Sequence, residues 1–293
     1  MTESAEAARA GRRKIALSLV AVYLVWGSTY LGLRFALESF PPFLLGGVRY
    51  GLAGLAMLAY ARHTGAAWPT AGEWARAVLL GALLFGIGNG LVGVAEHTIS
   101  SGVASIVVAT VAPWQVLFAA LFGVRPRPVE LVGVGFGLAG VAVLHAGGAF
   151  AGSLEGLVAI VIAPIGWALG AVLSARMKQP PGAMGAAVQM IAGGAVMGLV
   201  SLVLGERTGP ITASACLAFV YLLVFGSFVA FAAFRYLLMN ARPALASSYA
   251  FVNPMVALVL GALIASEPLT LLHLCACLLT GLAVVCILRG RRG

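Results

Sequence analysis

Residues 101–123 read SGVASIVVATVAPWQVLFAALFG, a stretch of sequence without one charged side chain. A helix of this length can cross the hydrocarbon core of a bilayer, which is about 30 Å thick. The rest of the chain has the same character, because 61% of its 293 residues are apolar and only 9% are charged. Soluble domains average about 25% charged residues. The sequence therefore predicts an integral membrane protein.

Ten apolar runs of this kind follow one another, joined by loops too short to hold a soluble domain. They do not alternate between apolar and polar residues, which excludes membrane-spanning strands. We therefore predict an all-α integral membrane protein with ten transmembrane helices. The runs cover residues 15–37, 43–61, 75–95, 102–123, 129–147, 156–175, 183–204, 212–233, 244–265 and 270–288.

Basic residues are divided unequally between the two ends of these spans. If the N-terminus is cytoplasmic, the cytoplasmic segments hold 15 of the 18 Lys and Arg residues, and the opposite loops hold only Arg207. This distribution is the positive-inside bias, and it accounts for the net charge of +9 without nucleic acid as a partner. It predicts a cytoplasmic N-terminal tail at 1–14 and a cytoplasmic C-terminal tail at 289–293.

The chain resembles itself after a shift of 141 residues, which aligns Trp26 with Trp167 and Pro113 with Pro254. Each half has five spans, and an odd number means that the halves enter the membrane in opposite directions. Such inverted repeats are typical of secondary transporters, which bind substrate near the bilayer midplane where the repeats meet. The predicted repeats are 15–147 and 156–288.

Three prolines, Pro113, Pro164 and Pro254, lie near the middle of predicted spans. Each removes a backbone hydrogen bond and can bend its helix, and the freed carbonyl needs a polar partner at that depth. Simple packing kinks remain an alternative. The equivalent positions of Pro113 and Pro254 in the two repeats favour hinges beside a cavity.

Polar and aromatic side chains inside the spans are the candidate substrate contacts, since an amide facing lipid is costly. They would either bind substrate or join helices, and the tryptophans could also be packing or interfacial residues. Arg49 needs a carboxylate such as Glu38 or Glu96, backbone carbonyls, water or an anionic substrate group. The predicted substrate-binding residues are Trp26, Tyr30, Arg49, Asn89, Trp114, Gln115, Trp167, Gln189, Tyr249 and Asn253.

Ionisable residues elsewhere in the spans are few. Arg34 is spaced to pair with Glu38 one helical turn later, or else its side chain extends along the helix to the membrane surface. No span has a carboxylate near its midpoint, so we do not expect a deep proton relay. The residues Glu96, His97, His145 and His273 lie toward the outer side, as sensors of external pH or as solvated helix ends.

Enzyme and cofactor motifs are missing from the sequence. The glycines of a GxGxxG pattern, Gly135, Gly137 and Gly140, lie inside an apolar span with no strand before them, so they indicate helix packing and not a dinucleotide site. The four cysteines lie in apolar runs without metal-binding spacing. We expect no cofactor, no metal and no catalytic residues.

An ordered set of residues along nearly the whole chain resembles the ten-helix EamA-type members of the drug/metabolite transporter superfamily. The set comprises Trp26-Gly27-Ser28, Pro42, Arg49, the stretch from Glu96 through Ser101 and Ala104 to Pro113, Pro243-Ala244, Pro254, Gly261, Glu267 and Gly281. The sequence departs from the family at Arg125-Pro126-Arg127-Pro128, where Gly-Glu is frequent. The resemblance implies a bacterial inner-membrane exporter of metabolites, and the aromatic residues make the chain similar to exporters of aromatic amino acids.

Taken together, these features predict a secondary transporter that exports a small amphipathic solute by alternating access, embedded in the bilayer as a monomer or homodimer. A nucleotide-sugar or drug carrier of the same architecture is the alternative. Phosphorylated substrates should require several basic residues in the cavity, and only Arg49 qualifies. An intramembrane enzyme would need a nucleophile or metal site, and a passive channel would not need paired hinges.

Overall fold

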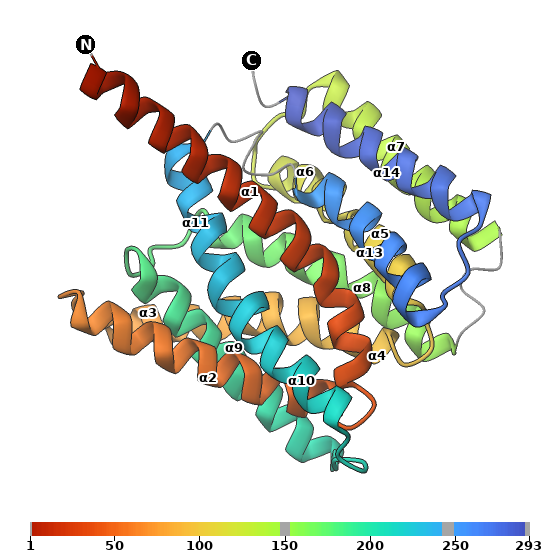
Figure 1. The fold of residues 1–293 in the computed structure, drawn as a ribbon, viewed down its shortest axis with the longest axis horizontal. Helices are drawn as coiled ribbons and strands as arrows, with labels where there is room; N and C mark the ends of the chain where they lie inside the picture. Colours follow the sequence, from red (N-terminus) through yellow and green to blue (C-terminus); the bar gives the residue numbers. More distant parts are fainter. Residues whose placement is uncertain (1, 147–152, 242–248, 291–293) are drawn as a thin grey trace.

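The computed structural model describes residues 2–146, 153–241 and 249–290, and every secondary-structure element in these ranges is a helix (Figure 1). Eight helices or helical segments are long and apolar enough to cross a membrane, and two shorter apolar helices, Pro128–Leu144 and Val252–Ala265, complete the set. The prediction of ten transmembrane helices in two inverted repeats is confirmed.

The first repeat begins with a long helix that also includes most of the predicted N-terminal tail. Its third span consists of three consecutive helical segments, and its fourth span of two. In order, the elements are α1 (Thr2–Ala36), α2 (Pro42–His63), α3 (Ala71–Gly81), η1 (Ala82–Gly90), α4 (Leu91–Ala95), α5 (Ser101–Val108), α6 (Val111–Leu121) and α7 (Pro128–Ala146).

The second repeat has the same order of spans. Its third span is again divided into three helical segments and extends to Asn240, beyond the predicted end at 233. The elements are α8 (Leu154–Ser174), α9 (Ala183–Leu204), α10 (Ala213–Tyr221), η2 (Leu222–Val229), α11 (Ala230–Asn240), α13 (Tyr249–Ala265) and α14 (Leu271–Gly290).

Both η segments are π-helical, a feature that the sequence analysis did not anticipate. The shift of 141 residues places η1 almost on η2, so the same irregularity occurs in both repeats. In each segment a side chain donates a hydrogen bond to the carbonyl five residues earlier: Asn89 Nδ2 to Leu84 at 3.1 Å, and Ser227 Oγ to Leu222 at 3.2 Å. Within α-helices π segments are frequently found at functional sites.

Glycines allow helices of opposite repeats to approach closely. The most extensive helix contacts join α2 to α9 and α7 to α14, and Figure 1 shows α7 beside α14. A Cβ atom on Gly194 of α9 would lie 2.6 Å from the backbone nitrogen of Gly51 on α2, and one on Gly133 of α7 would lie 2.8 Å from the carbonyl oxygen of Ala283 on α14. Only glycine permits this separation.

The start of α1 and the end of α14 lie at the same end of the bundle (Figure 1). We call this the terminal end, and the opposite end, where α1 finishes and α2 begins, the distal end. The predicted cytoplasmic side corresponds to the terminal end.

Candidate functional site

A cavity of about 300 Å³ lies between the two repeats. The first repeat contributes α1, α2, η1, α4, α5 and α6 to its wall, and the second contributes α8, η2, α11, α13 and α14. Its lining reaches Ile287 and Leu288, near the terminal end of α14. Cavities of about 300–1,000 Å³ with mostly apolar walls and a few polar groups are typical of small-molecule sites.

One aromatic cluster joins α1 to α11 and α13 on this wall. Trp26 packs against Phe231, Phe234 and Tyr249 with ring centroids 5.3, 5.0 and 4.9 Å away. Its indole nitrogen donates to the carbonyl oxygen of Gly226 in η2, at 3.2 Å. These contacts hold Trp26 in place, with Tyr30 on the same helix also lining the cavity.

A second aromatic group stands around Arg49. The guanidinium lies over the ring of Tyr50, 4.9 Å from its centroid. The ring of Tyr50 packs against Phe85, and Phe85 against Trp167 of α8, at 4.5 and 6.4 Å between centroids. Trp167 lines the cavity, as does its counterpart in the first repeat, Trp26.

Arg49 is buried, with 8% of its surface exposed. Its Nε donates to Ser227 Oγ at 3.0 Å. No carboxylate pairs with it among the residues that the structure describes, although Glu38 and Glu96 were the candidate partners. A buried cation without a carboxylate partner is costly unless another anion approaches it. Arg49 lines the cavity, so that anion can come from a solute.

Three amide side chains line the same cavity: Asn89, Gln115 and Asn253. Asn253 is 7% exposed, and its side-chain carbonyl oxygen has no hydrogen-bond partner in the described part of the chain. A buried acceptor without a donor destabilises the protein by about 1–3 kcal/mol, and a donor that reaches it removes this cost. The cavity therefore presents an unused acceptor as well as an unpaired cation.

The three prolines have different surroundings. Pro164 of α8 and Pro254 of α13 line the cavity, and each lies within a continuous helix. Pro113 follows a break between α5 and α6 at residues 109–110, and it packs against Gly137 of α7 outside the cavity. The carbonyl of Ala109 accepts a long hydrogen bond of 3.4 Å from the amide of Ala112.

Two predicted substrate contacts do not line the cavity. Trp114 packs its ring against Phe118 on its own helix, at 6.2 Å between centroids. Gln189 is hydrogen-bonded to Gln179, which lies before α9. Phe231 and Phe234 line the cavity and Ser227 contacts Arg49, but none of the three was predicted, because phenylalanine and serine are ordinary residues in an apolar helix. The remaining eight predicted contacts line the cavity.

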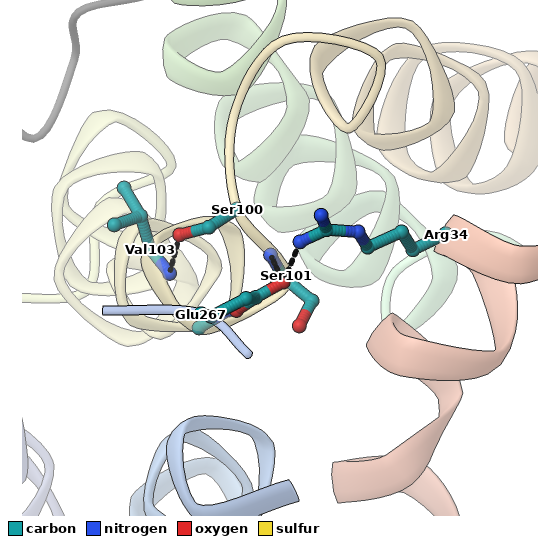
Figure 2. Close-up of polar contacts among 6 residues, drawn as sticks. Arg34, Ser100, Ser101, Val103 and Glu267 are labelled. Carbon is teal, nitrogen blue, oxygen red and sulfur yellow. Dashed lines mark hydrogen bonds and ion pairs between the residues drawn. The ribbon is translucent and has the colours of Figure 1, made fainter. Parts of the chain in front are cut away.

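The distal end is closed by a polar cluster between the repeats. Glu267, in the loop from α13 to α14, forms an ion pair with Arg34 of α1. The same carboxylate accepts hydrogen bonds from the backbone amides of Ser101 and Gly102, at 2.9 and 3.1 Å. Figure 2 shows Arg34 and Ser101 converging on Glu267. The prediction that Arg34 pairs with Glu38 is wrong, because Arg34 reaches across to the other repeat and Glu38 accepts from Ser214 instead.

A second glutamate from the second repeat caps a helix of the first at the same end. Glu206, in the loop between α9 and α10, accepts from the backbone amides of Phe43 and Leu44 at 3.3 and 2.8 Å. Carboxylates at helix N-termini satisfy free N–H groups and interact favourably with the helix dipole. Glu206 and Glu267 are therefore two cross-repeat caps that hold the distal end together.

Ten helices in two inverted repeats around a central cavity define a membrane transporter of the secondary type. The chain belongs to the EamA-like transporter family, whose model matches residues 13–145 and 154–289. The two matches correspond to the two repeats.

Relatives share nearly the whole architecture. The inner membrane transporter YedA of Escherichia coli strain K12 is 41% identical over 276 residues, which cover 94% of this chain and 90% of YedA. The transporter YdfC of Bacillus subtilis strain 168 is 29% identical over 253 residues, covering 85% of this chain and 83% of YdfC. Both are described as uncharacterized transporters. A protein of known crystal structure is similar in fold, with a TM-score of 0.69 at 23% identity over 95% of this chain and 98% of that one.

Proposed function

We propose that the protein exports small amphipathic amino acids, aromatic ones in particular, across the bacterial inner membrane by alternating access. The observation that carries this proposal is the unpaired cation Arg49 in a cavity with largely aromatic and apolar walls. The description of YedA as an inner membrane transporter supports the location. The positive-inside bias supports cytoplasmic termini.

The cavity offers complementary groups for each part of such a solute. The Arg49 guanidinium would bind the carboxylate, and charge-assisted hydrogen bonds of this type are strong. The free side-chain oxygen of Asn253 would accept from the ammonium group. Trp26, Tyr30, Trp167 and Tyr249 would hold the apolar side chain by area burial and ring packing. Pro164 and Pro254 border the cavity and would serve as hinges.

The alternative is a carrier of nucleotide sugars or drugs. Within the described part of the cavity wall, Arg49 is the only Lys or Arg, and a diphosphate would leave most of its charge unmatched there. Neutral or cationic drugs would not use the guanidinium. An anionic amphipathic solute with one carboxylate fits the charge of the cavity best.

Counterflow in proteoliposomes tests the proposal. Vesicles are loaded with one unlabelled amino acid at a time, and the entry of labelled phenylalanine or tryptophan is followed. We expect transient accumulation above equilibrium with aromatic amino acids inside. Folded protein that gives no accumulation with any amino acid, but does so with nucleotide sugars or drugs, would overturn the substrate class.

Two tryptophans provide a matched pair of variants for this assay. Trp167→Ala removes part of the cavity wall, whereas Trp114→Ala removes an equally large ring that lies outside it. We expect the Trp167 variant to lose tenfold or more in apparent affinity for tryptophan and the Trp114 variant to stay within about threefold of the parent. Equal losses in both would contradict the assignment of Trp167 to the site.

A further inference from the structure

A glutamate that the proposed transport site does not use is buried at the distal end. Glu96 directly follows α4 and lies outside the span Ala71–Ala95. Only 6% of its surface is exposed, and neither carboxylate oxygen has a hydrogen-bond partner among the described residues. A buried, unpaired carboxylate is among the most costly arrangements in a protein, and protonation is the usual way to relieve that cost.

Glu96 borders a hollow of about 530 Å³ at the distal end, separate from the central cavity. Glu267 and Arg34 line this hollow too, and both interact electrostatically with Glu96. Burial and the charge of Glu267 raise the pKa of Glu96 well above its ordinary value, and Arg34 opposes them. Because Arg34 is already engaged by Glu267, it is not available as a full partner for Glu96.

Other ionisable groups near this hollow have different partners or are open to solvent. On α1, Tyr30 lies within electrostatic range of Glu96, and Glu38 accepts from Ser214. His273 of α14 contacts Thr270 and interacts with Glu267. The exposed groups are His97 beside Glu96 and Glu155 at the start of α8.

We propose that Glu96 is a proton-binding site whose occupancy is required for the distal end to close. The proposal rests on the alternating access of the proposed transport cycle. In the closed arrangement the carboxyl group is neutral and shielded. When the cap formed by Glu267 opens, water reaches Glu96 and a proton leaves one of its oxygens to that water. Closing the distal end requires the proton to return from the distal side.

From sequence, Glu96 was expected to be a sensor of external pH or a solvated helix end. A solvated end is inconsistent with an exposed fraction of 6%. A proton site near the distal opening has a direct consequence for a transporter. Acid on that side favours the closed distal end, and alkali favours the open one.

Infrared pH-difference spectra of the reconstituted protein, without substrate, test whether Glu96 titrates as proposed. We expect an infrared band from a protonated carboxyl group that persists when the proton concentration is at least tenfold below the range in which glutamate ordinarily titrates. This band should disappear in Glu96→Gln. Glu96→Asp keeps a titratable carboxyl group, so it should show the band at a shifted position. This second variant tests the site even if Glu96→Gln folds poorly. A spectrum unchanged by Glu96→Gln would overturn the site.

Spin labels test the link to closure. Labels on Thr98→Cys and Leu271→Cys, both at exposed positions flanking the hollow, report the distance across it in a background without the native cysteines. We expect the long-distance fraction to grow severalfold as the pH rises, and Glu96→Gln to abolish this change. Glu130→Gln, which removes a half-buried carboxylate at the terminal end, is the matched control and should leave the pH response intact.

Three outcomes would overturn the proposal: a distance distribution that ignores pH, the same pH response in Glu96→Gln, or a response to Na⁺ at constant pH that depends on Glu96. None of these measurements needs a transported solute. A failure of phenylalanine counterflow with a normal titration of Glu96 would therefore disprove the proposed substrate while leaving the proton site in place.

Discussion

In the proposed transport site, Arg49 would decide which solutes the cavity accepts. Replacing it with glutamine removes the cation but leaves a polar side chain of moderate size. We expect Arg49→Gln to weaken counterflow of phenylalanine at least tenfold in apparent affinity, which corresponds to about 1.4 kcal/mol. The apparent affinity for phenylalaninamide, which lacks the carboxylate, should change little in this variant. The ratio of the two half-saturation concentrations is the measurement.

Ser227→Ala is the control for this prediction, because it removes the hydrogen bond to Arg49 Nε without removing the charge. It should preserve the preference for phenylalanine over its amide. A preference that survives in Arg49→Gln would instead make the arginine a structural link between α2 and η2.

Glu96 makes stability depend on pH in a direction that can be worked out. Its pKa is raised in the folded protein relative to the ordinary value of 4.5. The folded state therefore binds the proton more tightly than the unfolded state, and this stabilising contribution is lost as the pH rises from 4.5 through the raised pKa. We expect thermal unfolding in detergent to show the parent losing stability relative to Glu96→Gln over that window. If the stability of the two proteins changes with pH in the same way, the raised pKa of Glu96 is contradicted.

Sequence predicted the individual residues unevenly. Cavity-lining aromatic and amide residues were found because such side chains are unusual in a lipid-facing span. The partner of Arg34 was not predicted correctly. Glu38 is one helical turn away, whereas Glu267 is distant in the sequence and approaches Arg34 only when both repeats have folded. Trp114 and Gln189 show the limit of the same argument, because a polar or aromatic residue can also turn toward a neighbouring helix.

Helices were easier to predict than their irregularities. The apolar runs placed nearly every span within a few residues, because length and hydrophobicity alone set the crossing of the bilayer. The π segments leave no mark in composition, so their presence at equivalent positions of both repeats is visible only in the structure. The shift of 141 residues pairs the positions of α5 with 242–249, and all but the last of these positions lie outside the described residues.

The contact between α2 and α9 gives a prediction at this scale. A Cβ at Gly194 would lie 2.6 Å from the backbone of Gly51, whereas a Cβ at Gly198, one turn later on α9, would meet nothing within 4 Å. Gly194→Ala should reduce the free energy of unfolding by about 1–3 kcal/mol, as overpacking does. Gly198→Ala should leave it unchanged or raise it by up to about 1 kcal/mol through helix propensity.

Thermal or denaturant unfolding in the same detergent compares the two variants directly. Equal stability in both would mean that α2 and α9 can separate without cost, and would remove the close glycine contact as the reason for their association.

Over the whole molecule, the two ends differ in how they are held. Glu206 and Glu267 cap helices of the first repeat at the distal end. The shift of 141 residues pairs them with Gly65 and Pro126, which have no carboxylate. The first repeat thus has Pro126 where the second has Glu267, and this difference gives the two ends different polar contacts.

We expect Glu267→Gln to loosen the distal end. Loss of charge weakens the hydrogen bonds from Ser101 and Gly102, and bonds to charged groups contribute about 1.5–3 kcal/mol. Hydrogen exchange at these two amides should accelerate about tenfold or more. Glu130→Gln, which affects only a cap on the amide of Arg127 at the terminal end, should not change it. Unaltered exchange in Glu267→Gln would show that the cap does not limit opening.

The unequal ends separate two properties that a symmetric transporter would combine. In the proposed transport cycle, the cavity residues would determine what is bound, while the two loop glutamates at the distal end would bias the resting orientation toward one side of the membrane. A substitution in a loop can therefore reverse the preferred orientation and leave selectivity intact, and a substitution in the cavity can do the opposite. Descendants of the same duplicated gene can therefore acquire new substrates without a change in the preferred orientation of the transporter.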